Sequence, residues 1–264
     1  RVQVMFKQDV CVNCGKCVSV CPVGIHQISK EELRHVVDRT VQCIGCRKCA
    51  EVCPSRAIEI AGTIQTVSSL VEIIREDEEF YLNSGGGVTL SGGEATAQSE
   101  AVLSLLQACR RKGIHTALET CGYVKPEELL RIAEFVDLFL YDIKQIDPVE
   151  HNRWTGVYNE RILSNLCLLL QRQHCVKVRL PLLNGVNTAP EDIEGVARFL
   201  LPYREHKNFK GIDLLPYHKL GISKYRQLDM EYSFDGDPSL SEADLARIEE
   251  QLSHYSFQVR IIRH

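Results

Sequence analysis

Cysteine is concentrated near the N-terminal end of the sequence. Eight of the 12 cysteines lie in two similar strings that each end in Cys-Pro. The strings are Cys11-x2-Cys14-x2-Cys17-x3-Cys21 and Cys43-x2-Cys46-x2-Cys49-x3-Cys53. Nothing in the sequence marks export, so thiols at this density predict a metal site rather than disulfides.

The spacing favours two [4Fe–4S] clusters. In this pattern three closely spaced cysteines hold one cluster, and the fourth, before proline, binds the other cluster. The first cluster is thus assigned to Cys11, Cys14, Cys17 and Cys53, and the second to Cys43, Cys46, Cys49 and Cys21. Zinc is the alternative, but zinc sites usually pair two Cys-x2-Cys hooks. A module this small buries little apolar surface, so we expect its folding to depend on the metal.

Strand and helix patterns alternate after Pro54. Candidate strands span 87–91, 115–120, 136–143, 176–182, 211–216 and 257–262, and candidate helices span 99–112, 126–134, 160–172, 190–201 and 241–253. This alternation predicts an α/β fold with a parallel sheet, either open or closed into a barrel. We expect two domains, at 1–61 and 62–264.

Polar residues follow several of these strands at their carboxyl ends. They are Ser91-Gly92-Gly93-Glu94, Glu119-Thr120, Asp142 with Lys144, Arg179, and Pro216-Tyr217-His218. The carboxyl ends of parallel strands meet at one edge of the sheet, so the pattern predicts a ligand site there. Each feature also has a structural alternative, such as a glycine turn, an ion pair between Asp142 and Lys144, or a loop histidine at His218.

The charge balance excludes some partners. Lys and Arg number 31 against 35 Asp and Glu, without a long basic run, which argues against duplex nucleic acid and against a polybasic membrane surface. No apolar stretch is long enough to cross a bilayer, and the first residues carry no signal-peptide core. We expect a cytoplasmic protein with neither nucleic acid nor membrane as a partner.

Three motifs together resemble a known family. They are Ser91-Gly92-Gly93-Glu94, Asp142-Ile143-Lys144, and Leu214-Leu215-Pro216-Tyr217-His218 with the following Leu220-Gly221 and Lys224-Tyr225. The combination resembles the activating enzymes of glycyl radical enzymes, within the radical SAM superfamily. The resemblance implies a partial (β/α) barrel with an N-terminal ferredoxin-like domain that carries two auxiliary [4Fe–4S] clusters. It also implies that S-adenosylmethionine is cleaved reductively to place a radical on a glycine of a partner enzyme.

The resemblance implies roles for individual residues. Gly92, Gly93 and Glu94 would hold the amino group of S-adenosylmethionine, and Lys144 or Arg179 suits its carboxylate. The Asp142-Ile143-Lys144 triplet would lie against the ligand, and His218 would contact the ribose or adenine. A monovalent cation would be held by Glu119, Thr120 and Asp142. Every role belongs to the family pattern and is an expectation for this chain.

One family motif is absent from the sequence. The family holds a third, catalytic [4Fe–4S] cluster through Cys-x3-Cys-x2-Cys, whereas Cys17-x3-Cys21 is followed at the required place by Gly24 and Cys49-x3-Cys53 by Arg56. No catalytic residue is therefore identified. Because the chain begins with Arg1, we expect an N-terminal truncation that removes this motif and the first barrel strand. Such a fragment would not cleave S-adenosylmethionine.

Partners are also implied by the resemblance. Short stretches at 42–47, 218–221 and 261–264 look like those of activators whose partner is choline trimethylamine-lyase. Glycerol or propanediol dehydratase and 4-hydroxyphenylacetate decarboxylase are alternative partners. Electrons would come from flavodoxin or ferredoxin, and we expect an anaerobic setting. We also expect a cytoplasmic monomer, and association with a bacterial microcompartment is an open alternative. A ferredoxin-type electron-transfer protein without its own reaction is the alternative from another class.

Overall fold

The computed structural model describes residues 2–232, 234 and 236–263 and divides into two units. One unit comprises Arg1–Gln65 with Lys219–Asp235, and the other comprises Thr66–His218 with Gly236–His264. The first boundary lies close to the division expected after residue 61. The segment that begins at Lys219 differs from that expectation, because it packs with the N-terminal unit although it lies between the predicted strands 211–216 and 257–262 in the sequence.

Four short strands in two antiparallel pairs frame the N-terminal unit. The strands are β1 (Gln3–Phe6) with β4 (Ile58–Ala61), and β2 (His26–Ile28) with β3 (His35–Val37). The helices are η1 (Gln8–Val10), α1 (Lys16–Val20) and α2 (Lys48–Glu51), joined by η4 (Lys219–Gly221) and α10 (Ile222–Gln227). The internal repeat of the sequence is thus also a repeat of the fold, as β1-α1-β2 and β3-α2-β4, and each antiparallel pair joins one strand from each repeat.

Little apolar surface is buried in the N-terminal unit. Its core consists of nine buried residues, which are Val4, Phe6, Cys17, Ile25, Val37, Cys49, Ala57, Ile58 and Ile60. Two of the nine are cysteines of the strings, which the spacing predicts to be cluster ligands. Such a small cluster supports the expectation that metal binding contributes to the stability of this unit.

A six-stranded parallel sheet forms the centre of the second unit, in the order β10-β9-β8-β7-β6-β5. Its strands are β5 (Gly87–Leu90), β6 (His115–Thr120), β7 (Leu138–Asp142), β8 (Val176–Leu182), β9 (Phe209–Pro216) and β10 (Val259–Ile261). All six strands predicted from the sequence are confirmed, with ends that differ by at most two residues. Because every neighbouring pair of strands is parallel, their carboxyl ends lie at one edge.

Helices follow the strands as the alternating pattern predicts. The predicted helices are confirmed as α5 (Ser99–Arg111), α6 (Pro126–Ala133), α8 (Glu160–Gln171), α9 (Pro190–Leu200) and α11 (Glu242–Ser253). The prediction missed α3 (Val67–Arg75), α4 (Glu78–Ser84), α7 (Pro148–Thr155) and α10, as well as η2 (Ala95–Gln98) and η3 (Leu201–Tyr203). Local signals for two of them were present, since Thr66 forms a capping box with Ser69 and Asp147 caps α7 just before Pro148.

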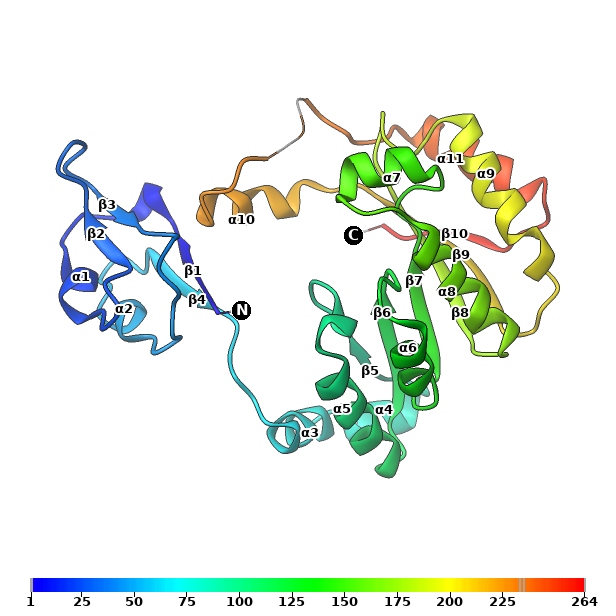
Figure 1. Ribbon diagram of the computed structural model, residues 1–264, viewed down its shortest axis with the longest axis horizontal. Coiled ribbons are helices and arrows are strands. Elements are labelled where there is room, and N and C mark those ends of the chain that lie inside the picture. Colours follow the sequence, from blue (N-terminus) through cyan, green and yellow to red (C-terminus); the bar gives the residue numbers. More distant parts are fainter. Residues whose placement is uncertain (1, 233, 235, 264) are drawn as a thin grey trace. The chain divides into compact units, whose positions relative to one another are not determined.

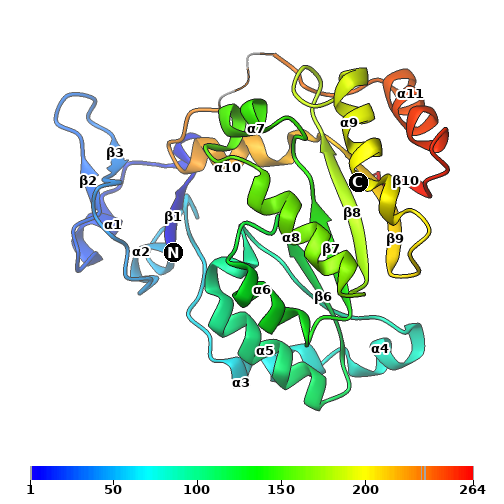
Figure 2. The same cartoon turned by 45° about the vertical axis from the view of Figure 1, so that its right-hand side comes forward.

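The two faces of the sheet differ in chemistry. One face, which carries Leu118, Phe139, Tyr141 and Val178, is fully buried in the main core. Helices α5, α6 and α8 lie along this side of the central strands (Figures 1 and 2). The other face carries half-buried polar side chains at alternating positions, which are Glu119, Asp142, Lys177, Arg179 and Asp213. The period of two along each strand therefore presents charge on one side of the sheet and the apolar core on the other.

None of the helices within residues 2–232, 234 and 236–263 combines the length and apolar character that a membrane crossing requires.

Candidate functional site

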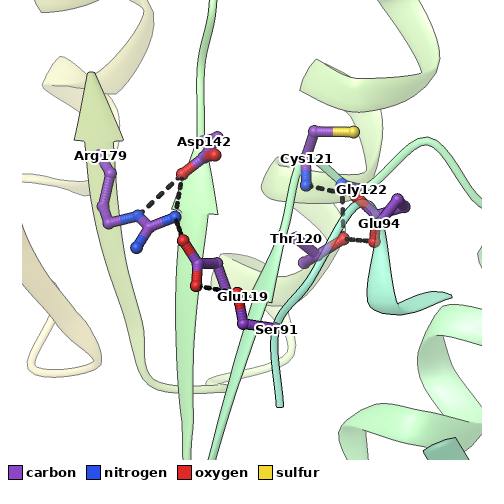
Figure 3. A network of polar contacts seen from close by, with 8 residues as sticks. All are labelled: Ser91, Glu94, Glu119, Thr120, Cys121, Gly122, Asp142 and Arg179. Carbon is purple, nitrogen blue, oxygen red and sulfur yellow. Dashed lines mark hydrogen bonds and ion pairs between the residues drawn. The ribbon is translucent and has the colours of Figure 1, made fainter. Parts of the chain in front are cut away.

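The carboxylate of Glu94 is held by a dense set of hydrogen bonds. Glu94 Oε1 accepts from the backbone N–H of Thr96 at 3.0 Å, from the Thr96 hydroxyl at 2.7 Å and from the Thr120 hydroxyl at 2.7 Å. Its Oε2 accepts from the backbone N–H of Cys121 at 2.9 Å. Figure 3 shows Glu94 between Thr120 and Cys121, so residues that follow two neighbouring strands meet at this side chain.

These hydrogen bonds set the charge of Glu94. Burial raises the pKa of Glu94, but the hydrogen bonds from Thr120, Thr96 and Cys121 outweigh it and leave the pKa below its usual value. The side chain is therefore ionised near neutral pH. Oε1 accepts three hydrogen bonds, whereas Oε2 accepts one from a backbone N–H, with the Cys121 thiol also bonded to the carboxylate, so Oε2 is the less occupied oxygen. The group is fixed and negative, with capacity left for a positively charged donor such as an ammonium.

The loop after β6 is held in place by contacts with buried residues of the main core. Gly122 has a φ of +72°, and a Cβ atom there would lie 1.7 Å from the hydroxyl of buried Tyr141, so only glycine fits. The amide of Asn165 donates to the carbonyls of Gly122 at 2.8 Å and Val124 at 2.9 Å. Burial, with Glu94 nearby, raises the pKa of the Cys121 thiol to about 11. This loop thus positions the Cys121 backbone, and its side chain stays a neutral thiol.

Arg179 gathers a second network on the polar face of the sheet. Its Nε donates to Asp142 Oδ1 at 2.8 Å, and its Nη2 donates to Glu119 Oε1. The Ser91 hydroxyl donates to the other oxygen of Glu119. Asp142 and Arg179 are register partners on β7 and β8, which explains why they meet (Figure 3).

The two carboxylates of this network respond differently to their surroundings. Burial raises the pKa of Asp142, and the attraction of Arg179 offsets only part of that effect. Burial also raises the pKa of Glu119, but there hydrogen bonds from Ser91 and Arg179 prevail and lower it overall. The Asp142 side chain is only 17% exposed and the Glu119 side chain 31%, so the cost of removing water is larger at Asp142.

The expected cation ligands fall into different networks. Glu119 and Thr120 are neighbours on one strand and point to opposite faces, so Thr120 binds Glu94 whereas Glu119 binds Arg179. The monovalent cation site stays a prediction.

Lys144 and Arg179 are the two basic residues expected to meet a ligand carboxylate. Two carboxylates already compensate the charge of Arg179. Exposed Lys144 is therefore the better placed of the two.

The other residues predicted to contact the ligand differ in backbone conformation and in exposure. Gly92 has a φ of +103°, whereas a Cβ at Gly93 would meet open space, so only Gly92 needs glycine for its backbone. Ile143 is 2% exposed and belongs to the main core, on the opposite side of the strand from Asp142. Lys144 is exposed, and its carbonyl accepts from the Asn187 amide at 2.7 Å. His218 is exposed just after β9.

Four cysteine thiols line one cavity of the N-terminal unit. Its cysteines are Cys11, Cys14, Cys17 and Cys53. Three of them belong to the first string and one to the second, which is the set that the spacing assigns to the first cluster. In the second set, burial raises the pKa of Cys49 to about 11, with smaller contributions from Cys21 and Cys43 nearby.

The chemistry around these sulfur atoms suits thiolates. Backbone N–H groups point at three of the sulfurs, from Asn13 to Cys11 Sγ at 3.5 Å, from Gly45 to Cys43 Sγ at 3.4 Å and from Ala57 to Cys53 Sγ at 3.3 Å. Hydrogen-bond donors of this kind stabilise negative sulfur. The donor set and the cavity therefore fit an iron–sulfur cluster better than an apolar core.

Sequence reasoning missed a pair of buried histidines in this unit. His26 Nδ1 and His35 Nε2 lie 3.0 Å apart, and both residues are 1% exposed. A ring nitrogen of each lies within 4.8 Å of Cys17 Sγ. Burial, with His35 and Arg39 nearby, lowers the pKa of His26 to about 4. The available signal was that the only two histidines of residues 1–65 lie between the cysteine strings.

Two family models match the chain. A 4Fe-4S dicluster domain matches residues 4–60, and the radical SAM superfamily matches residues 45–200. Among solved structures, a domain of pyruvate-formate lyase-activating enzyme from Bacteroides vulgatus is 29% identical with a TM-score of 0.56 and covers 67% of this chain and 99% of its own. Streptococcus suis SuiB bound to S-adenosylmethionine is 15% identical with a TM-score of 0.54 and covers 75% of this chain and 41% of its own, which shows the fold alone.

Curated relatives match almost the whole chain. The choline trimethylamine-lyase activating enzyme of Oleidesulfovibrio alaskensis is 55% identical over 264 residues, which is 100% of this chain and 85% of the relative. The trans-4-hydroxy-L-proline dehydratase activating enzyme of Clostridioides difficile is 39% identical over 261 residues, with 98% and 84% covered. These alignments run through all of the described elements, and they do not support the expectation of an inactive, truncated fragment.

Proposed function

The chain belongs to the radical SAM activating enzymes of glycyl radical enzymes, and from this premise we propose that its partner is choline trimethylamine-lyase. The observation that carries the proposal is the 55% identity over all 264 residues with an activating enzyme of that name. A plain electron-transfer protein is set aside, because the radical SAM superfamily model matches residues 45–200.

S-adenosylmethionine is proposed to bind at the carboxyl edge of the sheet. The ionised Glu94, fixed by Thr120 and the Cys121 backbone, provides a negative oxygen for the amino group of the ligand. Gly92 and Gly93 leave the approach free of side chains, and Lys144 provides a positive charge for the carboxylate. Asp142, held by Arg179, and His218 contribute further polar groups at the same edge.

Two [4Fe–4S] clusters are proposed in the N-terminal unit, with the ligand sets assigned from the spacing. When bound, they supply single electrons at low potential. The residues of this chain hold them through thiolates and backbone N–H groups, and the common cavity of Cys11, Cys14, Cys17 and Cys53 supports the first set. Electrons would come from flavodoxin or ferredoxin. No cysteines of the printed sequence have the Cys-x3-Cys-x2-Cys spacing, so no residue of it is assigned to a third cluster.

Calorimetry tests the ligand site. S-adenosylmethionine should bind the anaerobically prepared protein, and Glu94→Gln should weaken binding by at least tenfold, because it removes the charge while it keeps the shape. Glu100→Gln is the matched control, since Glu100 is exposed and pairs with Arg131 on the surface. Equal affinities of the wild type and Glu94→Gln would contradict the proposed site.

Electron paramagnetic resonance tests the partner. The radical requires the third cluster, for which the printed sequence offers no cysteine set, so the assay uses the protein expressed from its complete gene. With a reductant and S-adenosylmethionine it should produce a glycyl radical signal on choline trimethylamine-lyase and not on trans-4-hydroxy-L-proline dehydratase. The second enzyme is the appropriate control, because an activator with its name is 39% identical to this chain. A signal on the dehydratase alone would overturn the partner proposal and leave the family assignment intact.

A further inference from the structure

We propose that the buried His26–His35 pair donates one N–H to sulfur at the first cluster site, of which Cys17 is a ligand, and makes that cluster easier to reduce than the second. The inference rests on the proposed assignment of Cys11, Cys14, Cys17 and Cys53 to one cluster. It concerns two residues that neither the cysteine pattern nor the family motifs include.

The pair lies directly against the cluster cavity. His35 is on β3 and lines the cavity together with the four cysteines of the first set. His26 is on the neighbouring strand β2, and its Nδ1 lies 3.0 Å from His35 Nε2. The ring of Phe6 packs edge-on against His35 with ring centroids 4.4 Å apart. The orientation of His35 is therefore fixed from two sides.

One ring nitrogen on the outside of the histidine pair must carry an N–H group. Two neutral imidazoles carry two N–H groups between them, and one N–H is used in the hydrogen bond that joins the rings. One outer nitrogen must therefore carry the second N–H. The outer nitrogens are His26 Nε2 and His35 Nδ1, and neither has a hydrogen-bond partner among the described protein groups. A fully buried N–H without an acceptor is unfavourable.

Sulfur at the cluster site lies close to the pair. Cys17 Sγ and one ring nitrogen of each histidine lie within 4.8 Å of one another. His35 lines the cavity and its Nε2 is used in the contact with His26, so we assign the outward N–H to His35 Nδ1. Three residues so close could also bind a zinc ion, but Cys17 is the third cysteine of a ferredoxin string, and that spacing assigns it to a cluster.

The internal repeat shows that this donor is confined to one site. The two cysteine strings are offset by 32 residues, so the counterpart of His26 is Ile58 and the counterpart of His35 is Gln3. Ile58 is apolar and buried, and Gln3 is exposed. Reduction adds negative charge to a cluster, and hydrogen bonds to its sulfurs stabilise that charge. The pair therefore distinguishes two sites whose cysteine ligands are chemically alike.

A redox titration of the protein with its clusters reconstituted tests the proposal. Reduction of each cluster is followed by electron paramagnetic resonance in the wild type and in His35→Phe, which keeps a ring but removes the donor. The reduced-to-oxidised ratio of the more easily reduced cluster should fall about tenfold at fixed potential, a shift of about 59 mV for one electron. The second cluster should be unchanged. His35→Gln retains an N–H donor and should restore most of the ratio.

A second measurement does not depend on the potential. Pulsed electron paramagnetic resonance in deuterated buffer should detect exchangeable deuterons close to the reduced first cluster. The backbone N–H groups of Asn13 and Ala57 contribute in every variant, so the wild type and His35→Gln should show one deuteron coupling more than His35→Phe. Unchanged ratios together with an unchanged deuteron signal in His35→Phe would overturn the inference. Iron and zinc analysis of the wild type distinguishes failure of this inference from failure of the proposed function. Zinc in place of iron would overturn the cluster assignment on which the inference rests.

Discussion

The two units of this protein are stabilised by different means. The sheet unit buries a continuous apolar core between the helices and one face of its parallel strands, whereas the N-terminal unit buries nine residues around its cysteines. Apolar burial contributes about 25 cal/mol for each Å² removed from water, so the larger core supports its own fold. We expect the smaller unit to depend on bound metal. The difference teaches that one chain can contain a unit with a large apolar core and another whose own core is too small to account for its fold.

Removal of iron should give the largest difference in stability between the two units. A chelator under reducing, anaerobic conditions should abolish amide protection in β1–β4, because thiolate–metal bonds replace a core there. Protection in β6–β8 should persist, since those strands lie in the apolar core. Hydrogen exchange measured by mass spectrometry reports both regions at once. Persistent protection of β1–β4 in the iron-free protein would show that the small core is sufficient.

Truncation of a core leucine should produce the reverse pattern. Leu106 on α5 is 0% exposed, and Leu106→Ala should destabilise the sheet unit by about 2–5 kcal/mol through a cavity. Urea denaturation followed by helical circular dichroism measures the loss, and iron content should stay unchanged. Leu82→Ala is the control, because Leu82 is 80% exposed and should change stability by less than about 0.5 kcal/mol. A loss of iron in Leu106→Ala would mean that the units are not independent.

Asn165 tests how the core supports the ligand site. Asn165→Ala removes the two hydrogen bonds to the loop carbonyls of Gly122 and Val124, and should destabilise the sheet unit by about 1–3 kcal/mol. The affinity for S-adenosylmethionine should fall as well, because that loop positions the Cys121 N–H at Glu94. The exposed Asn83 also donates to a helix carbonyl, so Asn83→Ala is a matched control that should leave binding intact. Equal affinities in both variants would show that the loop holds its position without Asn165.

The smallest effect is expected where the late segment packs on the N-terminal unit. Arg39 donates to the Val4 carbonyl at 2.5 Å, to the Gln227 carbonyl at 2.8 Å and to Asp229 at 2.9 Å. Arg39→Gln should cost about 1 kcal/mol and speed proteolytic cleavage within 219–232. Arg34→Gln, which removes only an exposed ion pair with Glu32, is the control. Equal cleavage rates would show that other contacts hold the segment.

Local patterns explain why much of the fold was predictable. The six strands and five of the helices follow from apolar runs and from end signals such as Pro126, Pro190 and Gly113. Helix α7 escaped prediction because it has few apolar positions and its cap was the main signal. Helix α3 carries both a capping box and apolar residues at helical spacing, so its pattern was present in the sequence but overlooked. The site was predictable in part. Glu94 with Thr120, and Glu119 with Asp142 and Arg179, were expected at one edge, but their division into two networks was not.

The sequence by itself determined the chemistry that is encoded by spacing along the chain: the paired cysteine strings, the alternation of strands and helices, and the order of polar residues at strand ends. Only the tertiary structure decided which of these groups meet. Arg179 reaches Asp142 through strand register, His35 reaches His26 through the pairing of β2 with β3, and the segment after His218 packs on the N-terminal unit. Such contacts depend on positions far apart in the chain, and local propensity carries no information about them.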